Sequence, residues 1–150
     1  MKSIVLDATP LGLLAQPFAS PNGDRCRRWL LSKVAVGLEI VLPEIADCEV
    51  RRELVRAKKT ASVLALDNLG DNPQITYLPI TTQAMRLAAN LWAQARNRGL
   101  TTAHPKALDG DVILAAQVLS AGYDPADITI ATSNSKHLSQ FVSSAAWESI

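Results

Sequence analysis

The chain has 150 residues and a mass of 16.1 kDa, which suffices for one domain with a hydrophobic core and not for two of ordinary size. Its 48% hydrophobic and 19% charged residues exclude a disordered, collagen-like or low-complexity chain. The formal net charge of +1 excludes a global attraction to nucleic acid or membranes, so any site for a polyanion has to be local. We therefore predict a single domain over residues 1–150.

Short apolar runs and helical patterns alternate along the sequence. The runs predict strands that are buried on both faces, and apolar residues spaced three or four apart predict helices. In chain order we expect a strand over 4–6, a helix from 9 to 14, a helix from about 23 to 36, a strand over 40–42, a helix from 44 to 58, a helix over about 60–69, a strand over 75–78, a helix from 81 or 82 to 98, a helix from 109 or 110 to 121, and a strand over 128–131. Asn22 and Asp109 are expected N-caps, and Gly37, Gly99 and Gly122 are expected helix ends.

Strands separated by helices indicate right-handed βαβ crossovers. The predicted fold class is α/β, with a mainly parallel sheet of four to five strands and helices on both faces. In such sheets the functional crevice lies beyond the carboxyl ends of the strands. The catalytic or binding residues are therefore expected there.

Polar residues follow the first and the fourth predicted strand. Asp7 comes directly after the first strand, with Thr9 two residues on, and Asn134 follows the fourth. Because these strand ends share one edge, we expect Asp7 and Asn134 to be neighbours. Taken alone, Asp7 is equally well explained as a turn or cap residue.

Two helices carry acids that can join this edge. Glu49 lies on the helix after the second strand, and Asp111 lies beside Asp109 at the start of the helix from 109 or 110. A helix N-terminus stabilises a nearby carboxylate by roughly 0.3 to 1 kcal/mol. The alternatives are an exposed partner of an arginine for Glu49 and an ordinary N-terminal helix acid for Asp111.

Convergence of Asp7, Glu49 and Asp111 would demand a cation. Carboxylates about 5 Å apart repel by roughly 3 kcal/mol per pair at an effective dielectric near 20. Oxygen ligands without His or Cys suit Mg²⁺ or Mn²⁺ rather than Zn²⁺, and such sites act on phosphate esters. The three acids therefore predict a metal site for cleaving nucleic acid.

Basic residues concentrate in one part of the chain. Between Arg25 and Lys59 nine Lys and Arg stand against five Asp and Glu, so this part has a net charge of +4. A basic stripe on two helices would bind a phosphate backbone without reading bases. The alternative is that these side chains cover helix faces or pair with nearby glutamates.

Four segments in this order resemble the PIN domain, and within it the VapC-like toxins of prokaryotic toxin–antitoxin pairs. The resemblance runs nearly end to end. It rests on Ile4-Val5-Leu6-Asp7-Ala8-Thr9, Leu42-Pro43-Glu44-Ile45-Ala46-Asp47-Cys48-Glu49, Asp111-Val112-Ile113-Leu114-Ala115-Ala116 and Thr132-Ser133-Asn134-Ser135-Lys136-His137-Leu138.

The resemblance implies a Mg²⁺- or Mn²⁺-dependent endoribonuclease, usually a homodimer and often inhibited by a small cognate antitoxin. By position, Asp7, Glu49 and Asp111 would bind the metal, with Thr9 and Asn134 in support. Many PIN nucleases have a fourth acid where this chain has Asn134, which weakens a second metal site; Asp109 is the candidate to compensate. The residues assigned to RNA are Arg51, Arg52, Arg56 and Lys136.

Two other readings of the sequence remain. An aspartyl-phosphate protein would need a second aspartate in the first loop or an acceptor after the third strand, where Leu78-Pro79-Ile80 provides none. A PIN-like scaffold that binds nucleic acid or dimerises with an inactive site is the second. Proton transfer by His104 or His137 is not required by metal-assisted chemistry, and the three tryptophans are expected in the core.

The remaining signals concern location. Cys26 and Cys48 are too few for a disulfide scaffold and lack metal-ligand spacing, so both are expected to be packed thiols in a reducing cytoplasm. The N-terminal apolar run of Ile4–Leu6 is too short for a signal peptide or membrane span.

Overall fold

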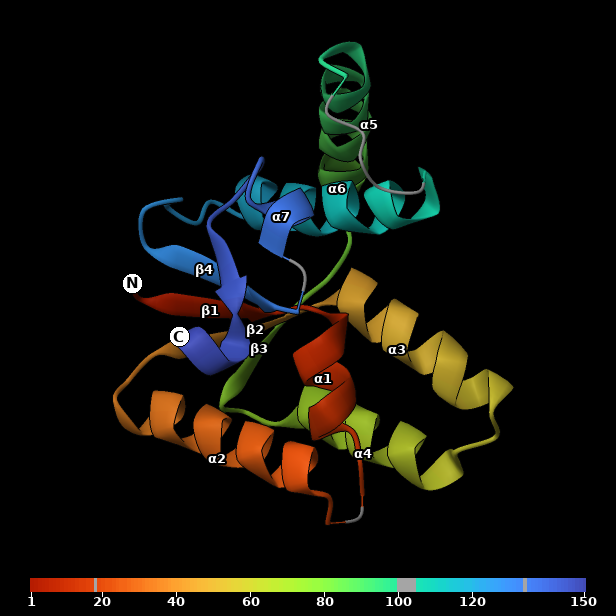
Figure 1. Cartoon of the computed structure of the whole chain (residues 1–150), viewed down its shortest axis with the longest axis vertical. Helices are drawn as coiled ribbons and strands as arrows, with labels where there is room; N and C mark the ends of the chain where they lie inside the picture. The colour runs from red at the N-terminus through yellow and green to blue at the C-terminus, as the bar shows by residue number, and fades with distance from the viewer. Residues whose placement is uncertain (18, 100–104, 134) are drawn as a thin grey trace.

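The fold was analysed in a computed structural model that describes residues 1–17, 19–99, 105–133 and 135–150, without the side chains of 105–108. Five strands form one sheet in the order β3-β2-β1-β4-β5, and every strand pair is parallel (Figure 1). The strands are β1 (Ser3–Leu6), β2 (Glu39–Pro43), β3 (Ile75–Leu78), β4 (Ile128–Thr132) and β5 (Ser144–Ala146). The predicted α/β class and parallel sheet are confirmed.

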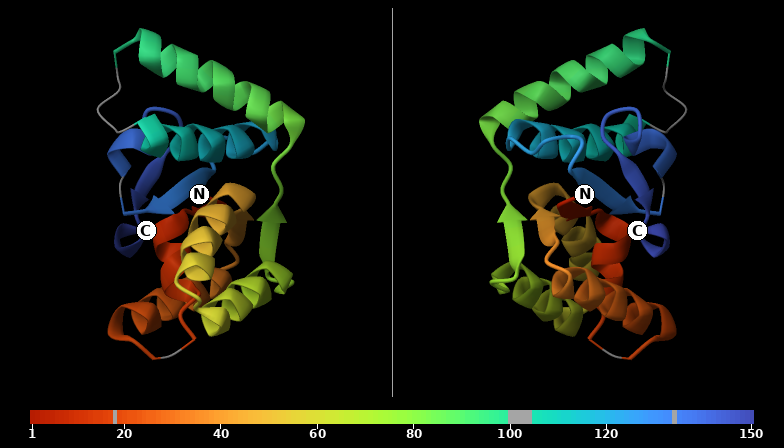
Figure 2. Two further views of the ribbon diagram at one scale, coloured as in Figure 1. Left: turned by 90° about the vertical axis from the view of Figure 1, so that its right-hand side faces the viewer. Right: turned by 90° about the vertical axis from the view of Figure 1, so that its left-hand side faces the viewer.

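Helices connect these strands and cover both faces of the sheet (Figures 1 and 2). They are α1 (Ala8–Leu14), α2 (Pro21–Ala35), α3 (Glu44–Arg56), α4 (Thr60–Asp71), α5 (Thr82–Asn97), α6 (Pro105–Ser120) and α7 (Ser135–Leu138), followed by a 3₁₀ turn, η1 (Trp147–Ser149). Among the described residues, no helix combines the length and the apolar character needed to cross a membrane.

Alternating side chains of the central strand divide the core in two. Ile4 and Leu6 of β1 face one cluster, which is closed by α1, α2, α3 and α4. Val5 faces the other cluster, in which Leu114 of α6 and Leu138 of α7 pack on the sheet. Strand β1 is fully buried between the two clusters, because Ile4, Val5 and Leu6 are each 0% exposed. This double burial is the reason that β1 is a continuous apolar run.

Helix α5 lies outside these layers. It packs on α6 through Ala88, which joins Val112 and Ala116 in a small cluster of its own. Figure 1 shows α5 standing away from the sheet, with α6 between them. One side of α5 is therefore left at the surface, and Trp92, although it lines a pocket against α6, is 38% exposed. The expectation that Trp92 is a core residue is wrong, whereas Trp29 and Trp147 pack edge to face in the first cluster with ring centroids 5.6 Å apart.

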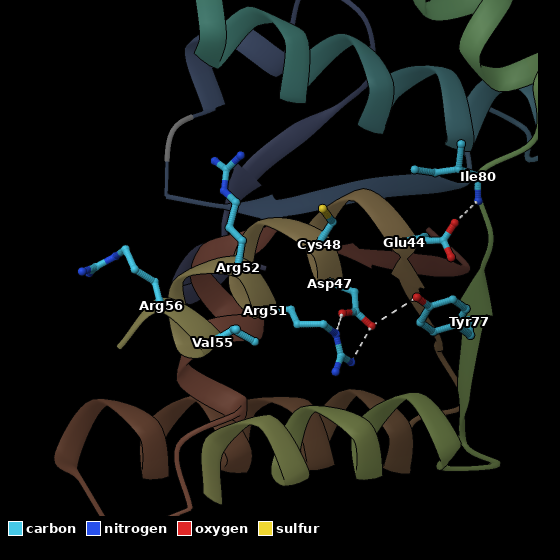
Figure 3. A pocket seen from close by; sticks show the side chains of 9 residues that line it. All are labelled: Glu44, Asp47, Cys48, Arg51, Arg52, Val55, Arg56, Tyr77 and Ile80. Atoms are coloured by element: carbon cyan, nitrogen blue, oxygen red, sulfur yellow. Dashed lines mark hydrogen bonds and ion pairs between the residues drawn. The ribbon is translucent and has the colours of Figure 1, made fainter. Parts of the chain in front are cut away.

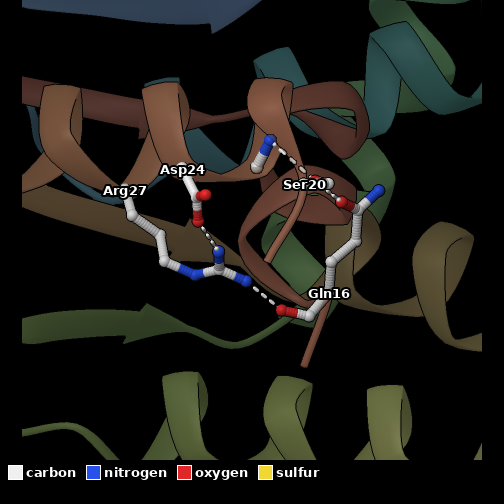
Figure 4. A network of polar contacts seen from close by, with 5 residues as sticks. Gln16, Ser20, Asp24 and Arg27 are labelled. Carbon is white, nitrogen blue, oxygen red and sulfur yellow. Dashed lines mark hydrogen bonds and ion pairs between the residues drawn. The ribbon is translucent and has the colours of Figure 1, made fainter. Parts of the chain in front are cut away.

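The predicted start of α2 is corrected by two residues. Ser20, not Asn22, is the N-cap, because its hydroxyl accepts the backbone N–H of Gly23 at 3.1 Å. Pro21 then occupies the first helical position, where its missing N–H is harmless. Figure 4 shows the surrounding network, in which Arg27 pairs with Asp24 and donates to the backbone carbonyl of Gln16. These contacts link Gln16, after the end of α1, to α2.

The predicted start of α6 is also wrong. The helix begins at Pro105, so Asp109 and Asp111 lie inside it rather than at its N-terminus. Neither the expected N-cap role of Asp109 nor stabilisation of Asp111 by the helix N-terminus applies. The difference arises because Pro105 fits both a loop and the first position of a helix, where its missing N–H is harmless.

Two further differences from the sequence predictions concern strand β5 and the exposure of the cysteines. Strand β5 has only three residues, Ser144–Ala146, and no β-branched or aromatic side chain that would signal a strand. Cys26 is buried as expected, but Cys48 is exposed. The prediction that both thiols are packed is therefore wrong for Cys48, which lies on the outer side of α3.

Candidate active site

Asp7 is held at the carboxyl end of the central strand β1. One carboxylate oxygen accepts the backbone N–H of Ala8 at 2.7 Å and so caps α1. The other accepts the hydroxyl of Thr132, at the end of neighbouring β4, at 2.6 Å. Asp7 is therefore both the predicted cap and a carboxylate in a set orientation at the edge where the strands end.

Glu49 reaches the same region from α3. The side chain is half-buried, and its Oε1 lies against the backbone of Gly110 on α6. Burial raises the carboxyl pKa of Glu49 above its ordinary value, and the charges of Asp7 and Asp111 raise it further. The Arg52 guanidinium acts in the opposite direction. Glu49 is thus not the exposed partner of an arginine that the alternative interpretation describes.

Asp111 completes the set from α6. Burial is the main cause that raises its pKa from 3.8 to about 6, and the negative charge of Asp7 is the second cause. The three acids come from three elements and interact electrostatically at one edge of the sheet. The charge of Asp7 thus acts on both other acids, and the convergence of the three on one metal stays a prediction.

The donor set fits a hard divalent cation in its chemistry. Carboxylate oxygens without His or Cys are the ligands that Mg²⁺ and Mn²⁺ prefer, and a cation would relieve the repulsion that raises the pKa of Asp111. The acids are nevertheless not drawn together as a finished ligand set: among the described residues, no three His, Cys, Asp or Glu side chains are grouped closely enough to hold a metal ion.

The raised pKa of Asp111 predicts a pH-dependent stability. An acid whose pKa is higher in the folded state destabilises the fold once it is ionised, so this penalty disappears as the pH falls through about 6 toward 3.8. We expect Asp111→Asn to be more stable than the metal-free wild type at pH 7 by about 1 kcal/mol, because partial exposure screens the charge. The difference should vanish near pH 4. Urea unfolding of both proteins between pH 4 and pH 7 measures this difference in the free energy of unfolding. A difference that does not change with pH would contradict the raised pKa of Asp111.

The three residues predicted to support the acids are Thr9, Asn134 and Asp109, and the structure places them differently. The Thr9 hydroxyl is hydrogen-bonded to Ser133, 2.8 Å away, and so links α1 to the end of β4. Asn134 lies outside the described residues. Asp109 is exposed and lines a pocket of about 430 Å³ between α5 and α6, together with Trp92 and Met85. The structure therefore places Asp109 against α5 and not among the three acids.

An ion-pair network ties α3, which carries Glu49, to β3 and α4. Asp47 is 6% exposed, and its carboxylate accepts Nε of Arg51 at 2.7 Å and the Tyr77 hydroxyl of β3 at 3.1 Å (Figure 3). Arg51 also pairs with Asp67 of α4 at 2.7 Å. The network joins α3 to β3 and α4. It also occupies Arg51, which was predicted to bind RNA. Sequence reasoning missed this role, although the four-residue spacing of Asp47 and Arg51 on one helix is a signal for such a pair.

The other predicted RNA-binding residues are at the surface. Arg52 and Arg56 are exposed and, with Arg51, line a pocket of about 820 Å³ along α3 (Figure 3). Arg56 pairs with Glu53, an exposed contact that contributes little to stability. Lys136 is exposed on α7. Of the two histidines, His137 is half-buried on α7, and His104 lies outside the described residues.

Comparison with known proteins identifies the fold. No family profile and no curated protein matches the sequence. The chain is similar to a chain in the crystal structure of VapBC2 from Rickettsia felis bound to a DNA fragment from their promoter, with a TM-score of 0.68 and 14% sequence identity. The match covers 97% of this chain and 98% of that chain. At this identity the likeness shows the fold, and the PIN-like fold predicted from the four segments is confirmed.

Proposed function

We propose that the chain is a Mg²⁺- or Mn²⁺-dependent endoribonuclease of the VapC type, which acts in the cytoplasm. The observation that carries the proposal is the set of three acids that follow β1 or lie on α3 and α6: burial raises the pKa of both Glu49 and Asp111, and the charge of Asp7 raises both further. Clusters of like charges at the carboxyl edge of a parallel sheet are typical of functional sites. The similarity of the fold to a chain of a VapBC2 assembly supports the proposal.

Asp7, Glu49 and Asp111 are the residues that would hold the metal. When bound, it would supply an activated water and neutralise charge on the phosphate. Thr132 orients Asp7 by its hydrogen bond, and the half-buried carboxylates of Glu49 and Asp111 lie on side chains that can turn about their own bonds. We propose that such rotations bring the three carboxylates to a common ligand position.

The RNA backbone would be held by basic side chains at the surface. Arg52 follows Glu49 by three residues on α3, and its positive charge lowers the pKa of Glu49. Arg52 is therefore close to the acids. We assign phosphate contacts to Arg52, Arg56 and Lys136, with no reading of bases. Arg51 is left out, because Asp47 and Asp67 already occupy its guanidinium.

Two partners are part of the proposal. The structurally similar chain belongs to a VapBC2 assembly, which supports a small cognate antitoxin that restrains this chain as well. The second proposed partner is another copy of this chain, with which it would form a homodimer. Apolar side chains at the surface, including Leu31, Val36 and Leu64, leave area for such contacts.

A catalytically inactive scaffold is the second candidate. One observation favours it: in the described residues the acids are not grouped as a finished ligand set. Cleavage of a labelled pool of structured RNA, measured with Mn²⁺, Mg²⁺ or EDTA, separates the two candidates. The nuclease cuts with either metal and stops in EDTA, whereas a scaffold that is folded and free of antitoxin binds RNA and leaves it intact in every condition.

A further inference from the structure

Gly110 occupies an unusual place in α6. It lies in the interior of a helix that runs from Pro105 to Ser120, directly before Asp111. Glycine is less favourable than alanine at such positions, because it loses more backbone freedom on folding. Its backbone does not require glycine either, since the glycines with positive φ are Gly37, Gly99 and Gly122. The reason for a glycine must lie in its surroundings.

The side-chain atoms nearest to a Cβ at position 110 all belong to the carboxylate of Glu49. A Cβ built on Gly110 would overlap Oε1 of Glu49 and would lie 3.3 Å from its Cδ. Gly12, in the interior of α1, shows the contrast, because a Cβ built there has nothing within 4 Å. Gly23, in the first turn of α2, also has a close contact, since a Cβ there would lie 2.6 Å from Oγ of the N-cap Ser20. Gly110 differs in that the group it meets is a carboxylate from another helix.

We infer that Gly110 is a positioning residue, whose missing Cβ leaves the space in which the Glu49 carboxylate lies against α6, one residue from Asp111. The inference deepens the proposed function and rests on it. Glu49 comes from α3 and Asp111 from α6, so the distance between these acids depends on how closely the Glu49 carboxylate approaches the α6 backbone. Gly110 sets that approach.

A methyl group at this position is expected to move the carboxylate and leave the fold in place. The atom that it meets is the far end of a flexible side chain, which can turn away toward solvent. The added methyl also raises helix propensity. Gly110→Ala should therefore unfold at the wild-type temperature or up to about 3 °C above it. Its defect should appear in metal binding alone.

The test compares Gly110→Ala with Gly12→Ala, a matched change in an open helical position. Mn²⁺ binding is measured by calorimetry, and thermal unfolding is followed in parallel. We expect the dissociation constant to rise about 10-fold in Gly110→Ala, as for residues that orient metal ligands, and to stay at the wild-type value in Gly12→Ala. In the background of Glu49→Ala the Gly110→Ala change should have no further effect on Mn²⁺ binding. A crystal structure of Gly110→Ala should show the Glu49 carboxylate displaced from α6.

The outcomes separate this inference from the proposed function. Unchanged Mn²⁺ binding by Gly110→Ala, or an equal loss with and without Glu49, would overturn the positioning role. So would a crystal structure with the Glu49 carboxylate in its wild-type place. A wild-type chain that binds no Mn²⁺ would instead overturn the proposed metal site, and the crystal structure of the variant would then decide the contact between Glu49 and residue 110 by itself.

Discussion

Asp111→Asn is expected to lower metal-dependent RNA cleavage by about 10²- to 10³-fold, the usual loss when one preorganised charged group is removed from a reacting centre. The substitution keeps the size of the side chain and removes its charge. Asp111 is half-buried and lies close enough to Asp7 for the two charges to interact. Losing this carboxylate leaves two of the three proposed ligands, so both the binding of the metal and the orientation of the phosphate suffer. Initial rates on one labelled RNA, at saturating Mn²⁺, measure the effect.

Asp109→Asn is the matched control for this experiment. It removes the same charge two residues away on the same helix, at an exposed position that lines the groove against α5. We expect its rate to stay within about twofold of the wild type, as for ordinary surface substitutions. Equal loss in both variants would argue against the assignment of Asp111. Cleavage that persists at the wild-type rate in Asp111→Asn would point to a contaminating nuclease or to a different site.

Mn²⁺ is expected to stabilise the folded chain strongly. A ligand that binds only the folded state at 100 times its dissociation constant adds about 2.7 kcal/mol to the free energy of unfolding. For a chain of this size the unfolding midpoint should rise by roughly 5 to 10 °C. The effect should be larger at pH 8 than near pH 5, because protons compete with the metal for Asp111, whose pKa is raised to about 6. Differential scanning calorimetry with and without the metal measures it.

The same variants show where the stabilising metal binds. Asp111→Asn should lose most of the shift, whereas Asp109→Asn should retain it, and EDTA should return the wild type to its metal-free midpoint. An equal shift in both variants would place the metal outside the three acids. In that case the raised pKa of Asp111 would reflect burial and the charge of Asp7 without a role in metal binding.

The aspartyl-phosphate interpretation finds no support in the architecture. In this sheet β3 is an edge strand, and Leu78 at its end is followed by Pro79 and Ile80. The backbone N–H of Ile80 donates to Glu44 at 2.9 Å, so this segment serves to tie β3 to the start of α3. The acids gather at the ends of β1 and on α3 and α6 instead, which agrees with the sequence argument against a phosphate acceptor after the third strand.

Much of the architecture could be predicted because local patterns and burial agree. Strand β3 has the predicted bounds, and β1, β2 and β4 extend the predicted runs by one or two residues. A strand buried on both faces is mostly apolar, so it is visible in the sequence. Helix ends were less certain, because Ser20 and Asn22 are both good caps and only the hydrogen bond to Gly23 distinguishes them. Strand β5 gave no signal, since its pairing with β4 and not its composition makes it a strand.

The sequence by itself determined the class of fold and the order of the elements from β1 to β4, because each element rests on residues close together in the chain. It also predicted the three acids as candidate ligands. Only the tertiary structure decided how these acids are held. Thr132 orients Asp7 across 125 positions of the chain, and Gly110 on α6 receives the carboxylate of Glu49 from α3. It also decided that Arg51 belongs to an ion-pair network. The physical reason is that a hydrogen bond, an ion pair or a shared space depends on distance in the fold, and separation along the chain carries no record of that distance.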